Sequence, residues 1–323
     1  MRDPLVIGVD AGATATRCAL SEFDGTILAR SEAGGANRNS SGAPPAETLA
    51  AALRTLLAQC PESIGRIALG VVGLAGAAAR MAEARAAAEA AWRAAGLPGR
   101  VVVVTDLEVG FAAGTPAPDG LLLLAGTGAV AAAFAGTRLT HRCDGYGWLL
   151  GDEGSAVWIG REALRAVMRA LDGRGPATAL TDAMCAALGA SGDSPEARAQ
   201  AVLRATFDRP PAALGALAPA VSDLAAAGDP VAAGIAEASA VHLLHTLATV
   251  GARAGLRDPA VVLAGSVLLS PGPVAERVRA AVRQRYRTVS KPARYGPAGA
   301  LWLAIAQVSG AAADPSVHAR LTR

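Results

Sequence analysis

A pattern that occurs twice constrains the fold of this chain more than any other feature of its sequence. The segment LVIGVDAGATATRCALSEFDGTILAR, which begins at Leu5, predicts a strand, a glycine-containing turn, a second strand, an Asp-Gly turn and a third strand. The segment GLLLLAGTGAVAAAFAGTRLTHR, which begins at Gly120, has the same order around a Gly-Thr-Gly turn. Such self-similarity indicates an internal duplication, with one meander of strands opening each half of the chain.

Between and after the two meanders, helical patterns alternate with short buried strands. The segments IALGVVGLAG and RVVVVTD are short and rich in valine, as are the strands of a parallel sheet that is covered on both faces. The segment AVVLAG, at 260–265, predicts a last buried strand. Helical patterns lie at 46–59, 78–95, 155–171, 177–188, 196–206, 212–226 and 230–255, and further helices begin at about Val274 and Pro297. We therefore expect an α/β fold of two similar lobes with a cleft between them.

The expected boundary between the lobes lies at TPAPDG, Thr115 to Gly120, which has the composition of a hinge. A length of 323 residues also favours two domains over one. We expect an N-terminal lobe of residues 1–117, completed by a C-terminal helix at about 298–323, and a C-terminal lobe of residues 118–297.

Composition argues against several classes of function. The formal net charge of +3 is small and spread along the chain, so we expect no nucleic-acid partner. The apolar run at 121–135 is short and interrupted by Gly-Thr-Gly, so we expect no membrane partner. The four cysteines form no CxxC pair and no signal-peptide pattern precedes the first strand, so we expect a cytoplasmic protein with reduced thiols. His242 and His245 have no clearly matched ligands in the sequence, and we interpret them as ordinary helix residues rather than as a zinc site.

The first glycine turn, DAGATATR, has the chemistry of a phosphate cradle. Glycine lets the backbone approach a ligand closely, and successive N–H groups together with threonine hydroxyls can bind phosphate oxygens. Asp10, at the end of a buried strand, is suited to hold Mg²⁺ through water. The alternative is a plain hairpin turn in which Asp10 bonds nearby amides. The second turn, AGTGA, repeats the design, so two such turns could grip a polyphosphate from both sides.

Asp106 follows the strand RVVVVT, at the carboxyl end where α/β sheets usually bind their ligands. A carboxylate there can accept the proton of a hydroxyl that attacks a γ-phosphate. The alternative is that Asp106 only caps the following turn. The loop Gly34–Gly42 is rich in amides and hydroxyls, and Asn37 and its neighbours either bind sugar hydroxyls or form turns.

The segment CDGYGWLLGDEGSAVWIG, at 143–160, sets three carboxylates among five glycines: Asp144, Asp152 and Glu153. Its flanks are apolar, which predicts burial of at least part of the segment. Buried carboxylates are costly unless something binds or pairs them. We therefore expect these acids to hold a ligand.

These segments, in their order along the chain, resemble the motifs of the actin-like ATPase and sugar kinase superfamily. DAGATATR resembles its first phosphate motif, LAGTGA its second, and VVLAGSVLLSPGPV its adenosine motif. More closely, the chain resembles the BadF/BadG/BcrA/BcrD-type ATPase family and, within it, the N-acetylglucosamine kinases. The string GDEGSAVWI is the most specific part of the resemblance, which runs from about residue 5 to residue 306.

The resemblance implies two actin-like (ribonuclease H-like) lobes that close over ATP and a hexose, with ATP and Mg²⁺ as cofactors. It implies that Asp10 positions Mg²⁺ and that Asp106 deprotonates the sugar hydroxyl. The residues that would bind the nucleotide are Asp10, Gly12, Ala13, Thr14, Thr16, Gly126, Thr127, Gly128, Gly265 and Ser266. Those that would line the sugar site are Asn37, Asp106, Gly145, Asp152 and Glu153.

Departures from the N-acetylglucosamine kinase pattern bear on the substrate. Asp144 stands where those enzymes have glycine, and Glu108 lies just beyond the expected base. Trp148 lies in the segment at 143–160, which is called the sugar loop below. Carboxylates favour the protonated amine of glucosamine through charge-assisted hydrogen bonds, and Trp148 would crowd an acetyl group. We therefore add Asp144 and Glu108 to the sugar site and expect ATP-dependent 6-phosphorylation of D-glucosamine, with N-acetylglucosamine as the alternative. A further alternative is that both carboxylates point to solvent.

A different class with the same family resemblance is the ATPase activator of 2-hydroxyacyl-CoA dehydratases. Such proteins need cysteines for a bridging iron–sulfur cluster, and Cys143 and Cys185 lack suitable neighbours in the sequence. The expected partner is therefore a small-molecule amino sugar. The oligomeric state stays open between a monomer and a homodimer.

Overall fold

The computed structural model describes residues 4–12, 15–36, 44–77, 80–286, 292–293, 295–309 and 314–323. Three of the expected site residues, Ala13, Thr14 and Asn37, lie outside these ranges. The chain folds into two compact units. Unit 1 comprises Met1–Asp119, Phe134–Leu139 and Ser290–Arg323, and unit 2 comprises Gly120–Ala133 and Thr140–Val289.

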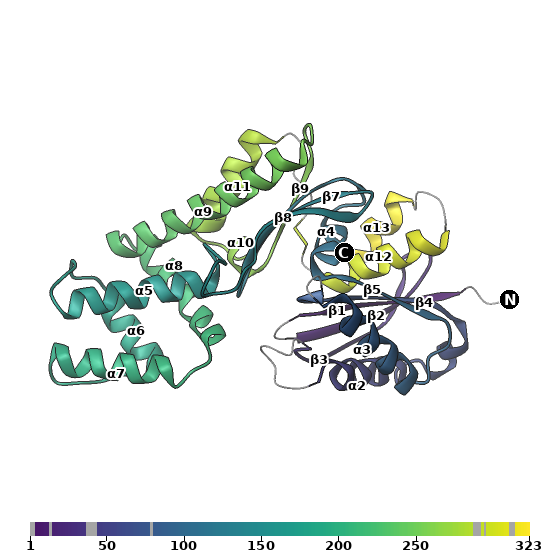
Figure 1. Cartoon of the computed structure of the whole chain (residues 1–323), viewed down its shortest axis with the longest axis horizontal. Coiled ribbons are helices and arrows are strands. Elements are labelled where there is room, and N and C mark those ends of the chain that lie inside the picture. The colour runs from purple at the N-terminus through teal and green to yellow at the C-terminus, as the bar shows by residue number, and fades with distance from the viewer. Residues whose placement is uncertain are drawn as a thin grey trace. The chain divides into compact units, whose positions relative to one another are not determined.

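A five-stranded sheet with the order β3-β2-β1-β4-β5 forms the centre of unit 1 (Figure 1). Its strands are β1 (Leu5–Ala11), β2 (Ala15–Glu22), β3 (Ile27–Gly34), β4 (Ile67–Leu74) and β5 (Arg100–Thr105). The first three strands pair antiparallel, whereas β4 pairs parallel with both β1 and β5. Because β1, β4 and β5 run in one direction, their carboxyl ends lie at the same edge of the sheet.

Helices cover both faces of this sheet. They are α2 (Pro45–Leu57), α3 (Met81–Ala94), α4 (Asp106–Gly114), α12 (Gly296–Ser309) and α13 (Pro315–Leu321), and a short 3-10 helix, η1 (Pro61–Arg66), precedes β4. Because side chains alternate along a strand, Leu5 and Ile7 of β1 pack into one core with α2 and α3. Val6 packs into the opposite core, with α4, α12 and α13. Gly8 faces the same way, and a methyl group there would lie 2.7 Å from the Leu301 nitrogen, so glycine lets α12 approach the sheet closely.

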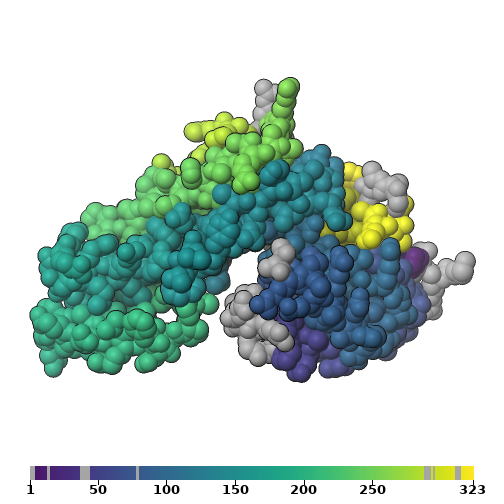
Figure 2. All heavy atoms as spheres, viewed as in Figure 1, coloured from purple at the N-terminus to yellow at the C-terminus, as the bar shows by residue number. Residues whose placement is uncertain are grey.

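Most of a four-stranded sheet with the order β8-β7-β6-β9, in which β6 and β9 are parallel, lies in unit 2, whereas the adjoining ends of β7 and β8, at 134–139, belong to unit 1. The strands of this sheet are β6 (Gly120–Ala125), β7 (Ala129–Ala135), β8 (Arg138–Asp144) and β9 (Ala260–Ala264). The helices of unit 2 are α5 (Ala156–Leu171), α6 (Leu180–Leu188), α7 (Pro195–Phe207), η3 (Pro211–Leu217), α8 (Ala218–Ala226), α9 (Pro230–Ala254), α10 (Ser266–Leu269) and α11 (Pro273–Arg285). Alternate residues of β6, Leu121 and Leu123, share a core with these helices. The helices α5 to α9 form a continuous surface, coloured teal to green in Figure 2.

The predicted α/β class is confirmed, and each meander forms three consecutive strands. The range 212–226, predicted as one helix, divides instead into η3 and α8. Pro219 explains the division, because proline lacks an N–H and clashes with the preceding turn of a helix. A second difference is α4, which begins at Asp106 although the sequence analysis predicted no helix there.

Helix α9 has 25 residues and a mean hydropathy of 1.3 in its most apolar stretch. By length and composition alone, such a helix could cross a membrane. In unit 2, however, Leu243, Leu247 and Val250 on α9 are buried in the hydrophobic core. The helix therefore packs as a core helix of unit 2.

Candidate functional site

Two carboxylates of the expected site lie at the carboxyl edge of the unit 1 sheet. Asp10 is the penultimate residue of β1, and Asp106 directly follows the last residue of β5. Across the sheet, Ala11 pairs with Leu74 of β4, and Leu74 pairs with Thr105. Each acid therefore lies one residue away from the row of paired residues Ala11, Leu74 and Thr105. One strand separates β1 from β5, so two strand spacings place the backbones about 10 Å apart at this edge.

Asp10 is partly buried on the face of the sheet that α12 covers. Burial raises the pKa of Asp10, and the Arg17 guanidinium offsets this rise only in part. Arg17 is also paired with Glu32, with 3.3 Å between Arg17 Nε and Glu32 Oε2. A methyl group on Gly296, the first residue of α12, would overlap the Asp10 carboxylate. Desolvation of a carboxylate with so little compensating charge is costly, so Asp10 fits a cation such as Mg²⁺, which prefers oxygen ligands.

The first glycine turn is described at both of its ends. Gly12 N–H donates to the Ala15 carbonyl at 2.9 Å, and the Gly12 carbonyl accepts from Ala36 N–H at 3.1 Å. Thr16 is fully buried at the start of β2, and within the described part of the chain its hydroxyl has no hydrogen-bond partner. Buried hydroxyls are nearly always paired. The Thr16 hydroxyl is therefore a group that a bound ligand oxygen could satisfy.

The N-terminus of α4 is capped by Thr105 and Glu108. The Thr105 hydroxyl accepts from Glu108 N–H at 3.2 Å, and Glu108 Oε2 accepts from Thr105 N–H at 2.8 Å and from the Thr105 hydroxyl at 2.9 Å. This reciprocal pair is a capping box. Thr105 and Glu108 thus supply this cap, and the expected role of Asp106 stays a prediction.

The same contacts correct the interpretation of Glu108 as a sugar ligand. Glu108 is buried, and its second oxygen, Oε1, accepts from Leu139 N–H at 3.4 Å. Both carboxylate oxygens are thus engaged within unit 1. The spacing Thr-x-x-Glu at 105–108 is a recognisable capping signal in the sequence, and it would have identified this structural role.

In unit 2, three segments that are distant in the sequence meet: the second glycine turn at 126–128, the loop at Asp152 and the residue that precedes α10, Gly265. Within that turn, Gly126 N–H donates to the Gly128 carbonyl at 2.9 Å, and Thr127 is exposed. A methyl group on Gly128 would lie 2.9 Å from Asp152 Oδ2, and one on Gly265 would lie 2.8 Å from Gly126 N. Gly265 has a φ of 88° and precedes α10, which begins at Ser266. The residues expected for the phosphate, adenosine and sugar motifs of this half are therefore neighbours.

Asp144 organises the loop that carries the other two acids. Its Oδ1 accepts from Asp152 N–H at 2.8 Å, and its Oδ2 accepts from Glu153 N–H at 2.9 Å. Asp144 and Asp152 both have positive φ angles, of 63° and 55°. Gly145, with a φ of 76°, lies against Val130 at the start of β7. Both Asp144 oxygens are used by the backbone, so the structure corrects its expected role from that of a free counter-charge to that of a loop anchor.

Asp152 lies against the second glycine turn, at Gly128. Burial raises the pKa of Asp152, and the neighbouring Asp144 charge raises it further. Hydrogen bonds from the Ala129 and Gly147 N–H groups act in the opposite direction but do not cancel the rise. A ligand that brings additional donors would therefore stabilise the charged form of Asp152.

Glu153 has a partner that the sequence analysis did not identify. Its Oε2 lies 3.2 Å from Nδ1 of His242 on α9. One turn earlier on the same face, the buried Ser239 hydroxyl donates to the Gly154 carbonyl at 2.8 Å. His242, which the sequence pattern left as an ordinary helix residue, thus has a contact at the candidate site. Among the described residues, no cluster of three metal-binding side chains occurs.

A hollow of about 220 Å³ adjoins Ser266. Ala156 and Ile159 of α5 line one side of it, and residues of α8 and α11 line the others. The N-terminus of α5 is tied to the glycine turn, because Ala156 N–H donates to the Gly126 carbonyl at 2.8 Å. This hollow therefore opens next to the turn and beside the expected adenosine motif.

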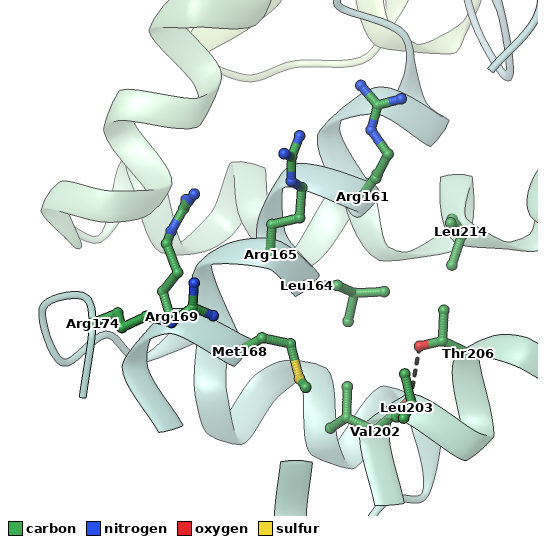
Figure 3. Close-up of a pocket in the computed structure, with 10 residues that line it drawn as sticks. All are labelled: Arg161, Leu164, Arg165, Met168, Arg169, Arg174, Val202, Leu203, Thr206 and Leu214. Carbon is green, nitrogen blue, oxygen red and sulfur yellow. Dashed lines mark hydrogen bonds between the residues drawn. The ribbon is translucent and has the colours of Figure 1, made fainter. Parts of the chain in front are cut away.

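Figure 3 shows another hollow of unit 2, of about 340 Å³, bounded by α5 and α7. Its lining combines apolar side chains with four arginines: Arg161, Arg165, Arg169 and Arg174. None of the expected site residues lines it. Among the residues that line it, Arg161 bonds to the sugar loop: its Nη1 donates to the Trp148 carbonyl at 2.8 Å. We assign this bond to the support of the loop rather than to the site itself.

The sequence profile of the BadF/BadG/BcrA/BcrD ATPase family matches residues 7–304 of the chain. Among curated proteins, the N-acetylmuramic acid/N-acetylglucosamine kinase of Clostridium acetobutylicum is 31% identical over 182 residues, 54% of this chain and 57% of that protein. The N-acetyl-D-glucosamine kinase of Dictyostelium discoideum is 28% identical over 199 residues, 57% of this chain and 60% of that protein. The matched part thus spans less than two thirds of either relative.

The fold has a counterpart that covers nearly the whole chain. The solved structure of a candidate N-acetylglucosamine kinase from Chromobacterium violaceum is 25% identical and superimposes with a TM-score of 0.69. The comparison covers 93% of this chain and 99% of that one. The likeness therefore extends over most of both units.

Proposed function

The chain belongs to the BadF/BadG/BcrA/BcrD ATPase family, and on that premise we propose that it is an ATP-dependent kinase of amino sugars. One observation carries the proposal: Asp152 of the sugar loop, the Gly126–Gly128 turn and Gly265 are in contact in unit 2. A kinase needs its sugar and nucleotide ligands held side by side, and these contacts bring the corresponding motifs together. The names of the two curated relatives support an N-acetylated amino sugar as the class of substrate.

The nucleotide half of the proposal assigns phosphate contacts to the two glycine turns and to Thr16. The exposed Thr127 supplies one donor, and the Thr16 hydroxyl, which has no hydrogen-bond partner among the described residues, supplies another. The 220 Å³ hollow beside Ser266 is the proposed place of the nucleoside. Asp10 is the proposed holder of Mg²⁺, whose charge, when bound, neutralises the phosphates during transfer. Asp10 would hold the ion through water, because Mg²⁺ retains most of its hydration shell.

Asp106 is the proposed general base. It stands at the carboxyl edge of the unit 1 sheet, and its helix is capped by other side chains. In the reaction, Asp106 would accept the proton of the sugar hydroxyl while that oxygen forms its bond to the γ-phosphorus and the bond to the β-phosphate oxygen breaks. The products are the sugar phosphate and ADP.

The finer proposal concerns the sugar, with phosphorylation at the 6-hydroxyl of D-glucosamine or of N-acetyl-D-glucosamine. The charge argument for free glucosamine depended on Asp144 and Glu108. Both acids accept hydrogen bonds from backbone N–H groups with each of their carboxylate oxygens. These hydrogen bonds weaken the expected preference for the protonated amine of glucosamine, and the acetylated sugar becomes an equally supported candidate.

The test is an ADP-release assay with ATP and Mg²⁺ over D-glucosamine, N-acetyl-D-glucosamine, N-acetylmannosamine and glucose. We expect turnover with at least one of the two glucosamine sugars, and the ratio of their kcat/KM values decides between them. Absence of ADP release with every amino sugar, from a folded protein that binds ATP, would reject the proposed activity.

A further inference from the structure

One face of α9 holds the loop that carries Glu153. The Ser239 hydroxyl, which is fully buried, donates to the Gly154 carbonyl at 2.8 Å. Leu243 fills the space beside Gly154, because a methyl group there would lie 2.7 Å from Leu243 Cγ. His242, between these two residues in the sequence, places Nδ1 3.2 Å from Glu153 Oε2. Three successive contacts from one helix face thus fix the backbone at 154 and the side chain at 153.

The His242 ring is itself held in place. The Trp158 ring packs against it edge to face, with ring centroids 5.2 Å apart and an interplanar angle of 64°. Trp158 lies in the first turn of α5, where its backbone N–H donates to the Ser155 hydroxyl at 3.1 Å. The imidazole is therefore fixed both by α9, which carries it, and by α5, and its Nδ1 is directed toward Glu153.

We propose that His242 is a positioning residue: its Nδ1–H holds the Glu153 carboxylate in the orientation that accepts a hydroxyl of the amino sugar. The inference rests on the proposed kinase function and adds a residue to it. A glutamate side chain has several freely rotating bonds, so without a partner Glu153 would sample many orientations. One donor to one carboxylate oxygen leaves the other oxygen for the ligand.

The exposure of the His242 and Glu153 side chains predicts which quantity their contact affects, ligand affinity or folding stability. The His242 and Glu153 side chains are 37% and 54% exposed, and ion pairs of that kind contribute little to folding stability. A contact that contributes little to stability but orders a ligand-binding side chain acts chiefly on ligand affinity. We therefore expect loss of the contact to change the KM for the sugar more than the thermal stability.

The experiment compares His242→Ala with His242→Asn and with His245→Ala in the ADP-release assay. An asparagine amide can place a donor close to the position of Nδ1, whereas alanine cannot. His245 is on the same helix, is exposed, and serves as the matched control. For His242→Ala we expect the sugar KM to rise about tenfold, the value of roughly one charge-assisted hydrogen bond, with kcat and the KM for ATP changed less than about threefold. His242→Asn should recover most of the loss, and His245→Ala should match the wild type.

A double-mutant cycle tests whether the effect passes through Glu153. In a Glu153→Ala background, which should itself raise the sugar KM, His242→Ala should add little, because alanine offers no acceptor for the Nδ1–H to orient. Equal effects of His242→Ala in both backgrounds would overturn the positioning role, as would an unchanged sugar KM or an equal shift in His245→Ala. A drop in melting temperature with parallel losses in kcat and in both KM values would instead show a structural role. Wild-type activity separates the two proposals: turnover with no His242 effect rejects only the positioning role, whereas no turnover rejects the kinase function and this role with it.

Discussion

Gly296→Ala should strongly reduce the proposed kinase activity by moving Asp10. An ideal methyl group at 296 would overlap the Asp10 carboxylate and lie 2.8 Å from the Asp10 Cβ. Carbon atoms in contact prefer a separation of about 3.5–4.0 Å, so Asp10 or the start of α12 must shift by about 1 Å. A displacement of that size in a group that positions reactants costs about 10²-fold in rate. We therefore expect kcat/KM to fall about a hundredfold, which corresponds to about 2.7 kcal/mol.

Stability should change in the same variant, but by a smaller amount. Overpacking costs about 1–3 kcal/mol, and replacing glycine by alanine within a helix returns about 0.5–1 kcal/mol. The control is Gly234→Ala in α9, where nothing lies within 4 Å of the added methyl group. That variant should be slightly more stable and fully active. Kinetics and thermal unfolding of both variants provide the measurement, and wild-type kcat/KM in Gly296→Ala would refute the requirement for a fixed Asp10.

Asp106→Asn should retain ATP binding, measured by calorimetry, and lower kcat by about 10²–10⁴-fold, the usual effect of losing a positioned general base; near-normal turnover would remove Asp106 from that role. Chelation of divalent cations with EDTA should abolish ADP release and excess Mg²⁺ should restore it, whereas activity in EDTA would refute the assignment of Asp10. The raised pKa of Asp152, caused chiefly by burial, means that this acid becomes protonated at a higher pH than the ordinary 3.8. Its ability to accept sugar hydroxyls is therefore lost as pH falls through that raised value, so the sugar KM should increase on acidification. In Asp152→Asn this part of the pH profile should be absent, and an identical profile in both proteins would contradict the proposal.

The parts of the fold that depend on local sequence could be predicted. Valine-rich runs and glycine turns are signals within a few residues, so the two meanders and the strands β4, β5 and β9 were placed correctly. The expected position of Asp106 followed from the same reasoning, because the carboxyl end of a buried strand is a local feature. The capping box of α4 was equally local, and it explains Glu108 without any ligand.

The partners of the loop carboxylates could not be predicted in this way. Asp144 bonds the N–H groups at 152 and 153 in a loop where Asp144 and Asp152 adopt positive φ angles, which residues other than glycine seldom do. The contact between Glu153 and His242 joins a loop to a helix that begins many residues later, so it depends on how α9 packs in unit 2. Neither pattern is encoded in the spacing of residues along the chain.

The three acids of the sugar loop therefore differ in what a substrate can gain from them. Asp144 is occupied by two backbone N–H groups and serves to shape the loop. Glu153 has a side-chain partner that leaves one oxygen for a ligand. In Asp152, burial and the charge of Asp144 disfavour ionisation more than its two N–H donors favour it. New donors stabilise a charge most where the existing environment stabilises it least, so hydroxyls of a bound sugar would interact most favourably with Asp152. Discrimination between sugars should accordingly depend on the contacts of Asp152 and Glu153, and only indirectly on Asp144.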